Sequence, residues 1–239
     1  MYKKINASLA VLSEKYNLER GEVIDRNGMP ALRTAAGCTT ALLPWRIERR
    51  FMELKNFITG KTLDNHSTLR FASQSAGGDL SCQLGKELDL ATWMIDSEAI
   101  SLFAACSGKN TANVIVKFAN GMSASIECGN LLPAGSDPMD RHEIIAGRGV
   151  ASDQSLDTQV RQYSIYAFTD SGVERFTDID SELFSFTDSE IWLTRAAMAV
   201  LAKPELGECW EKAAEKMTAM AAAVFDSDKT ASVIALGGK

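Results

Sequence analysis

The sequence lacks the features that usually assign a chain to a class at first sight. Its five cysteines are scattered without C-x-x-C spacing, and its two histidines are too far apart to suggest a zinc site. His66 and His142 both stand in polar surroundings, so we interpret them as surface or interface residues. No apolar run approaches the roughly 20 residues that a membrane helix needs. We therefore expect a cytoplasmic protein with reduced thiols, no metal site and no membrane segment.

Charge of one sign is not concentrated anywhere. The net charge is −6 at pH 7 without charge blocks, whereas a nucleic-acid partner would need a clustered basic face. The first residues are basic, but the apolar stretch that follows is interrupted at 13–15 and no small-residue cleavage site comes after it. We interpret this segment as an amphipathic helix and not as a signal peptide. Its stripe is expected to pack on its own domain or on a partner: Ile5, Leu9, Leu12 and Tyr16.

What the sequence does contain is ordinary globular composition. Hydrophobic residues make up 46% of the 239, which is enough to form a core in one domain or two small ones. Helical spacing predicts a helix over 47–58, where Phe51 and Leu54 share one face. Further helices are predicted in the stretch 81–96, after a capping box at 187–190, and around Trp210.

Between residues 100 and 130 the apolar period becomes two, which is typical of strands. Segments 112–118 and 122–128 alternate on either side of Asn120-Gly121, a pair that predicts a hairpin with positive φ at both turn residues. Residues 18–37 are polar and receive no element. Shorter strands are predicted at 39–43, 68–73, 143–146 and 162–169.

These elements predict an α+β fold, with a mostly antiparallel open sheet and helices packed on one face. The outer face of the predicted hairpin mixes apolar and polar side chains, among them Ile115 and Lys117. Such a face is either solvated or forms a moderately wet subunit interface.

Motif searches leave one pair of residues with possible chemistry. There is no P-loop and no G-x-S-x-G, and the G-R-G at 147–149 is interpreted as a tight turn because no helix follows it. Cys82 and Lys86 lie one turn apart near the start of a predicted helix, where a cation and a helix N-terminus can lower the pKa of a thiol. The alternative is a small apolar cysteine beside a solvated lysine, because no general base is near in the sequence.

The order of these segments resembles the C-terminal half of the glucose–fructose oxidoreductase and inositol dehydrogenase family (Gfo/Idh/MocA). PWRIERRFMELKNFITGK, at 44–61, is similar to the family's R…p…k…i..G.iG segment, and GGDLSCQLGKELDLATWMID, at 77–96, to its GGG.L.D.G.H..Dl..wl.G. NVIVKFANGMSASIECG, at 113–129, and HEIIAGRGVASD, at 142–153, resemble its sheet strands. The resemblance covers residues 40–226 and implies a dihydrodipicolinate-reductase-like sheet.

Members of this family carry a dinucleotide-binding domain with a G-x-G-x-x-G turn, a Glu-Lys-Pro lysine, and an Asp and a His four residues apart on the helix quoted above. The sequence contains neither of the first two motifs. If Asp89 matches the family's helix aspartate, the His position is Lys86 and the Asp position is Cys82. The resemblance therefore implies a lost dyad, because a lysine of ordinary pKa is poorly matched to accept a proton at neutral pH.

The resemblance also implies a division of the chain, with 1–40 as the remnant helix and loop of a truncated cofactor domain and 41–239 as the family's C-terminal domain. It implies no cofactor on this chain, and NAD or NADP only if a partner chain supplies the missing domain.

Three functions stay open. The first is a non-catalytic subunit that forms a homodimer or higher homo-oligomer through the open sheet face, or that holds a full-length family member. The second is an enzyme, either half of a split NAD(P)-dependent sugar or polyol dehydrogenase or an activity built on Cys82 and Lys86. The third is a sugar-binding module whose contacts are Arg46, Lys86 and Asp89.

Overall fold

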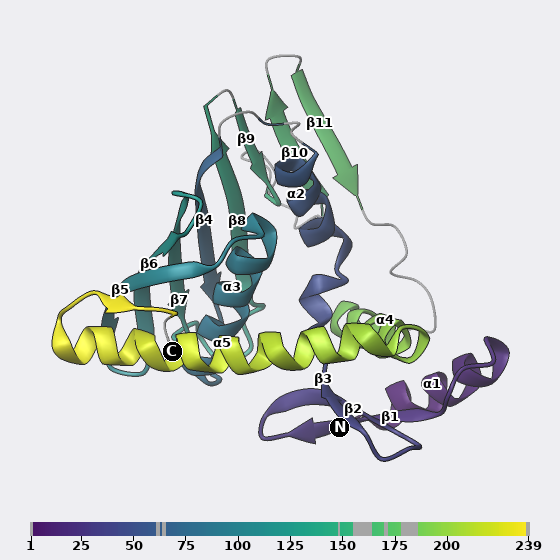
Figure 1. Cartoon of the computed structure of the whole chain (residues 1–239). Helices are drawn as coiled ribbons and strands as arrows, with labels where there is room; N and C mark the ends of the chain where they lie inside the picture. The colour runs from purple at the N-terminus through teal and green to yellow at the C-terminus, as the bar shows by residue number, and fades with distance from the viewer. Residues whose placement is uncertain are drawn as a thin grey trace. The chain divides into compact units, whose positions relative to one another are not determined.

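The computed structural model describes residues 2–60, 63, 66–147, 149–154, 164–169, 172–177 and 186–237 (Figure 1). The chain divides into two compact units. The first combines Met1–Glu48 with Ile179–Lys216, and the second combines Arg49–Asp178 with Met217–Lys239. The N-terminal segment therefore forms one body with residues that come much later in the chain. Its origin as a remnant of a cofactor domain stays a prediction.

The first unit packs helices against a small antiparallel sheet. Its elements are α1 (Lys3–Lys15), β1 (Gly21–Arg26), β2 (Met29–Thr34), β3 (Thr39–Ala41), the 3-10 turn η1 (Pro44–Arg46), α4 (Asp188–Ala202) and the first part of α5 (Pro204–Thr230). Ile5 and Leu9 of α1 are buried in one cluster with residues such as Val200 of α4. The amphipathic helix thus folds back on its own chain, although Ser13 is buried in place of Tyr16, which is exposed. The predicted capping box at the start of α4 is confirmed.

A hairpin in this unit was not predicted. Strands β1 and β2 pair antiparallel through the turn at Asn27-Gly28, where both residues have positive φ, 56° and 85°. Positive φ at both central residues is the type I′ geometry that Asn-Gly favours. The prediction that residues 18–37 contain no element was therefore wrong, and the Asn-Gly pair was the signal for the correct one.

The second unit is built on a nine-stranded sheet in the order β11-β10-β9-β8-β4-β7-β6-β5-β12. Among the paired strands only β4 and β7 run parallel. The strands are β4 (His66–Gln74), β5 (Ala99–Ser107), β6 (Thr111–Phe118), β7 (Ser123–Gly129), β8 (Met139–Ala146), β9 (Gly149–Ser152), β10 (Ser164–Thr169), β11 (Gly172–Thr177) and β12 (Ile234–Ala235). Residues 162 and 163 of the predicted strand 162–169 lie outside the described residues. The predicted α+β class with a mostly antiparallel sheet is confirmed.

Helices of the second unit lie on one side of this sheet, as Figure 1 shows for α2 (Arg49–Thr59) and α3 (Leu80–Ile95). Helix α3 begins at the N-cap Asp79, whose side chain accepts from the N–H of Ser81, and this cap satisfies one of the free donors of the first turn. Its buried side is turned toward β4 and β7 and includes Leu84 and Leu88. Gly85 lets the residues of α5 come close, because a Cβ there would lie 2.8 Å from Met217 Cγ.

The predicted hairpin of β6 and β7 is present, but its turn differs from the prediction. Of the two turn residues only Gly121 has positive φ, at 88°. The N–H of Gly121 donates to Phe118 O, and the N–H of Phe118 donates to Met122 O. This is a three-residue loop with glycine in the left-handed position, so Asn120 is not under the constraint that the sequence suggested. None of the described helices is long and apolar enough to cross a membrane.

Candidate functional site: an ion network around His142

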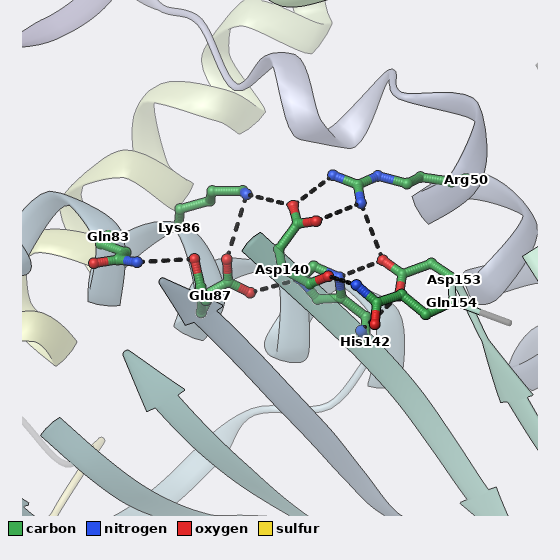
Figure 2. A network of polar contacts seen from close by, with 9 residues as sticks. Arg50, Gln83, Lys86, Glu87, Asp140, His142, Asp153 and Gln154 are labelled. Carbon is green, nitrogen blue, oxygen red and sulfur yellow. Dashed lines mark hydrogen bonds and ion pairs between the residues drawn. The ribbon is translucent and has the colours of Figure 1, made fainter. Parts of the chain in front are cut away.

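Four segments of the second unit bring charged side chains together on the helix-covered face of the sheet. Asp140 and His142 alternate on β8 and so share one face. Lys86 and Glu87 come from α3, and Arg50 comes from the first turn of α2. Asp153 follows β9, which pairs with β8. Figure 2 shows these side chains converging between the helices and the strands.

His142 is the centre of the network and is fully buried. Its Nε2 lies 2.9 Å from Glu87 Oε2, and its Nδ1 lies 2.6 Å from Asp153 Oδ2. The other oxygen of Asp153 accepts from the backbone N–H of His142 at 2.7 Å. The rings of Phe51 and Phe71 pack edge-on against the imidazole, with centroids at 4.7 and 4.8 Å. Both ring nitrogens therefore have a carboxylate partner, and aromatic rings pack against the rest of the imidazole.

Two cations complete the network on its more exposed side. Arg50 donates to both oxygens of Asp140, at 3.0 and 2.7 Å, and also to Asp153 at 3.1 Å. Lys86 Nζ lies 3.3 Å from Glu87 Oε1 and 3.9 Å from Asp140 Oδ2. Bidentate arginine–carboxylate pairs are among the strongest polar contacts in proteins. With His142 protonated, three cations face three carboxylates, so the cluster is electrically balanced.

The electrostatic environment favours that balanced state. Burial alone would lower the pKa of His142, but the carboxylates of Asp153 and Glu87 outweigh it and raise the pKa of His142 to about 9. Burial would raise the pKa of Glu87, yet the charges of Lys86 and His142 lower it. The pKa of Asp140 is likewise lowered, mainly because Arg50 outweighs the effect of burial. At neutral pH His142, Glu87 and Asp140 therefore carry their charges.

This arrangement is poorly suited to proton transfer. A histidine that is already protonated cannot accept a proton at neutral pH, and both of its nitrogens face carboxylates within hydrogen-bond distance. Among the described residues no group of His, Cys, Asp and Glu is placed to hold a metal ion. What the cluster does instead is join α2, α3, β8 and the segment after β9 through buried charged contacts.

The structure places the residues singled out from the sequence in different settings. Lys86 joins the network, with its side chain 27% exposed. Cys82 is exposed and lies 3.5 Å from Asp79 Oδ2. Partial burial and the nearby Asp79 raise the pKa of Cys82, the opposite of what an activated thiol requires. Asp89 is buried on α3, and Arg46 belongs to η1 of the first unit. At the predicted turn 147–149, Arg148 lies outside the described residues.

The interpretation of His142 as a surface or interface residue was wrong. Its partners come from 55 residues earlier and 11 residues later in the chain, so no local pattern could show them. Two local signals for burial did exist. His142 shares its strand face with Ile144, and Glu87 lies three residues after Leu84 on the apolar side of α3. A charged residue on an apolar face indicates a buried partner.

Comparisons with known proteins place this fold. No family model matches the sequence, and no curated protein is a significant match. Solved structures do match. One is an oxidoreductase from Agrobacterium radiobacter in complex with NAD+, L-tartaric acid and magnesium, with a TM-score of 0.63, 14% identity, and coverage of 80% of this chain and 63% of that one. Another is levoglucosan dehydrogenase in complex with NADH and L-sorbose, with a TM-score of 0.67, 13% identity, and coverage of 82% and 65%.

These likenesses show that the chain shares the fold of Gfo/Idh/MocA-type oxidoreductases, which confirms the structural part of the resemblance seen in the sequence. The chain spans less than two thirds of the length of these structures. At this level of identity the likeness concerns the fold, and fold alone does not carry an activity.

Proposed function

We propose that this chain is a non-catalytic subunit with an oxidoreductase-type fold, and that it associates with a second copy of itself through the open face of its sheet. The observation that supports the non-catalytic assignment is the ion network around His142. Its histidine is buried, protonated at neutral pH and saturated by Glu87 and Asp153. A site of acid–base chemistry needs a group that can take up or release a proton next to substrate.

The helix motif supports the same conclusion in either alignment with the family pattern. Aligning on Asp89 gives Lys86 and Cys82 at the His and Asp positions. In the family pattern a glycine precedes the histidine by two residues, and aligning on Gly85 instead gives Glu87 and Gln83. Neither alignment restores an Asp and a His. The second one places a carboxylate where the family has its imidazole, and here that carboxylate is turned toward His142.

The open face carries an apolar centre that suits an interface. On β5 and β6 the side chains of Phe103 and Ile115 are directly paired across the strands and are 42% and 48% exposed. Large apolar side chains grouped on an exposed sheet face mark interaction surfaces in soluble proteins.

The polar residues around this centre suit a second copy. Ile115 lies between Lys117 and Asn113 on β6, and Asn113 is paired with Glu127 of β7. The basic and acidic side chains thus lie on opposite sides of the apolar centre. A two-fold axis that reverses the strand direction brings Lys117 of each copy toward Glu127 of the other, as a self-complementary interface requires.

The test measures the mass of the purified chain by light scattering and native mass spectrometry. We expect a dimer that Ile115→Lys converts to a folded monomer, with an unchanged circular dichroism spectrum and a melting temperature that no longer depends on protein concentration. Val11→Lys, which changes another exposed β-branched residue, on α1, is the matched control and should leave the dimer intact. A monomeric wild-type chain, or a dimer insensitive to Ile115→Lys, would refute the interface. Micromolar binding of NADH to this chain alone, followed by fluorescence, would refute the non-catalytic assignment.

The runner-up is half of a split dehydrogenase, favoured by the NAD+ and NADH bound in the similar structures. In that arrangement a partner chain would hold the dinucleotide. It predicts that a mixture with a cofactor-domain protein oxidises a sugar or polyol, and that Lys86→Ala abolishes this activity. Absence of NADH binding to the isolated chain does not separate the two proposals, whereas the mixing experiment does.

A further inference from the structure

The outer edge of β5 is closed by the C-terminal turn of α5 and the chain that follows it. Alternate residues of β5 point their backbone groups away from β6, and these lie at Ile100, Leu102, Ala104 and Cys106. Leu236 donates its N–H to Ile100 O at 2.8 Å, and Ile234 pairs with Leu102 in the short strand β12. Figure 1 shows this returning segment beside β5.

At the next two outward-facing positions of β5 the backbone N–H groups are bound by side chains and not by a strand. Ala104 donates its N–H to Ser227 Oγ at 3.0 Å, and Cys106 donates its N–H to Asp228 Oδ1 at 2.7 Å. Ser227 is fully buried and also donates to Ser232 O at 2.6 Å. Each outward position from Ile100 to Cys106 therefore has a partner, although β12 itself is only two residues long.

The two closing residues are poor choices for the helix that carries them. Serine and aspartate have lower helix propensity than alanine, and a carboxylate in the last turn is unfavourable beside the negative end of the helix dipole. Asp228 stands two residues before the end of α5. Their positions are explained by the N–H groups of β5 and not by the stability of α5.

We propose that Ser227 and Asp228 form an edge plug, which prevents a second copy of this chain from adding its own β5 to this edge. Exposed edge strands are templates for pairing with another chain. Pairing of β5 with β5 uses the same edge on both copies and closes at two copies, but together with the face interface it would join dimers into longer assemblies. The plug therefore confines self-association to the sheet face. The proposal of the plug is based on the contacts at the edge of β5. The proposed face interface involves other residues.

The test compares Ser227→Ala/Asp228→Ala with Asp226→Ala, a neighbouring exposed acidic residue of α5, and with Asp228→Asn, which keeps the acceptor oxygen. In the double variant we expect amide exchange at Ala104 and Cys106 to accelerate about tenfold, the equivalent of one hydrogen bond. We also expect species larger than the wild-type dimer, whose mean mass by light scattering increases with protein concentration. Asp226→Ala and Asp228→Asn should behave as wild type.

Unchanged amide exchange at Ala104 and Cys106 in the double variant, or growth that is equal in Asp226→Ala, would overturn the plug. If circular dichroism shows that the double variant is less folded, the single variant Asp228→Ala is used in its place. The proposal then requires that the Cys106 amide exchanges faster in Asp228→Ala than in the wild type. Repeating the experiment with Ile115→Lys separates the two proposals. In that background the plug predicts dimers joined through β5 when Ser227 and Asp228 are replaced, whereas a failed face interface leaves the wild type monomeric from the start.

Discussion

The charge on His142 makes the stability of the protein depend on pH in a defined window. In the unfolded chain a histidine has a pKa near 6.5, while in the folded protein the pKa of His142 is raised to about 9. The folded state therefore holds the proton more tightly. This contribution to stability is fully present below pH 6.5, falls as the unfolded chain releases its proton above that pH, and is lost once the pH passes about 9.

The difference between the two pKa values corresponds to about 3 kcal/mol of unfolding free energy. The assay is urea unfolding of the wild type at intervals between pH 6 and pH 9.5, where the free energy should decline by up to about 1.4 kcal/mol per pH unit. The matched variant is His142→Gln, which should be less stable at pH 6 and should lose most of this slope. Thiols with raised pKa, such as Cys128, also respond at alkaline pH and do so in both proteins.

A direct titration checks the same reasoning. The sequence has two histidines, so the ring signals of His142 and His66 can be followed by NMR with a His66→Gln variant for assignment. Glu87→Gln removes one of the two carboxylates at the imidazole, and it should lower the pKa of His142 and shift the stability loss to lower pH. A wild type whose unfolding free energy is flat from pH 6.5 to 9, or a His142 signal that titrates below pH 7, would refute the balanced-network interpretation.

Three further changes test other parts of the structure. Arg50→Met leaves Asp140 and Asp153 without their shared cation and should lower the unfolding free energy, measured by chemical denaturation, by about 3 kcal/mol. The control is Arg49→Met, an exposed neighbour on α2, which should lower it by less than about 1 kcal/mol. Gly28→Ala forces an alanine into positive φ and should destabilise by about 1 kcal/mol in thermal melts; no change would argue against the type I′ turn. Alkylation of Cys82 by iodoacetamide should keep accelerating beyond pH 9, because its pKa is raised; a rate that levels off near pH 7 would restore the activated thiol.

The sequence predicted the elements whose signals are local. The apolar faces of α2 and α3, the capping box of α4 and the paired strands β6 and β7 depend on residues within one or two turns of each other, and the structure contains them. The Asn27-Gly28 hairpin was missed because its strands are short and partly polar. At Asn120-Gly121 the same dipeptide occurs in a longer loop, since flanking strands and not the pair alone decide the turn.

The candidate site could be predicted only in part. Lys86 was singled out for its position on α3, but its role depends on Glu87 and Asp140, and the latter arrives from another strand. The buried state of His142 results from contacts with α3 and with the segment after β9. Contacts over such separations are set by the strand order, and that order was not accessible from periodicity.

The position of β4 in the sheet has a consequence for how the protein is made. Its two neighbours, β7 and β8, both follow it in the chain, and β8 ends about seventy residues after β4. At ribosomal speeds of about 5–20 residues per second, the backbone edges of β4, whose apolar residues include Leu69 and Phe71, have no native strand partner for several seconds. A nascent chain of this protein should therefore be a substrate for chaperones that bind extended apolar segments, up to the moment when β8 leaves the exit tunnel.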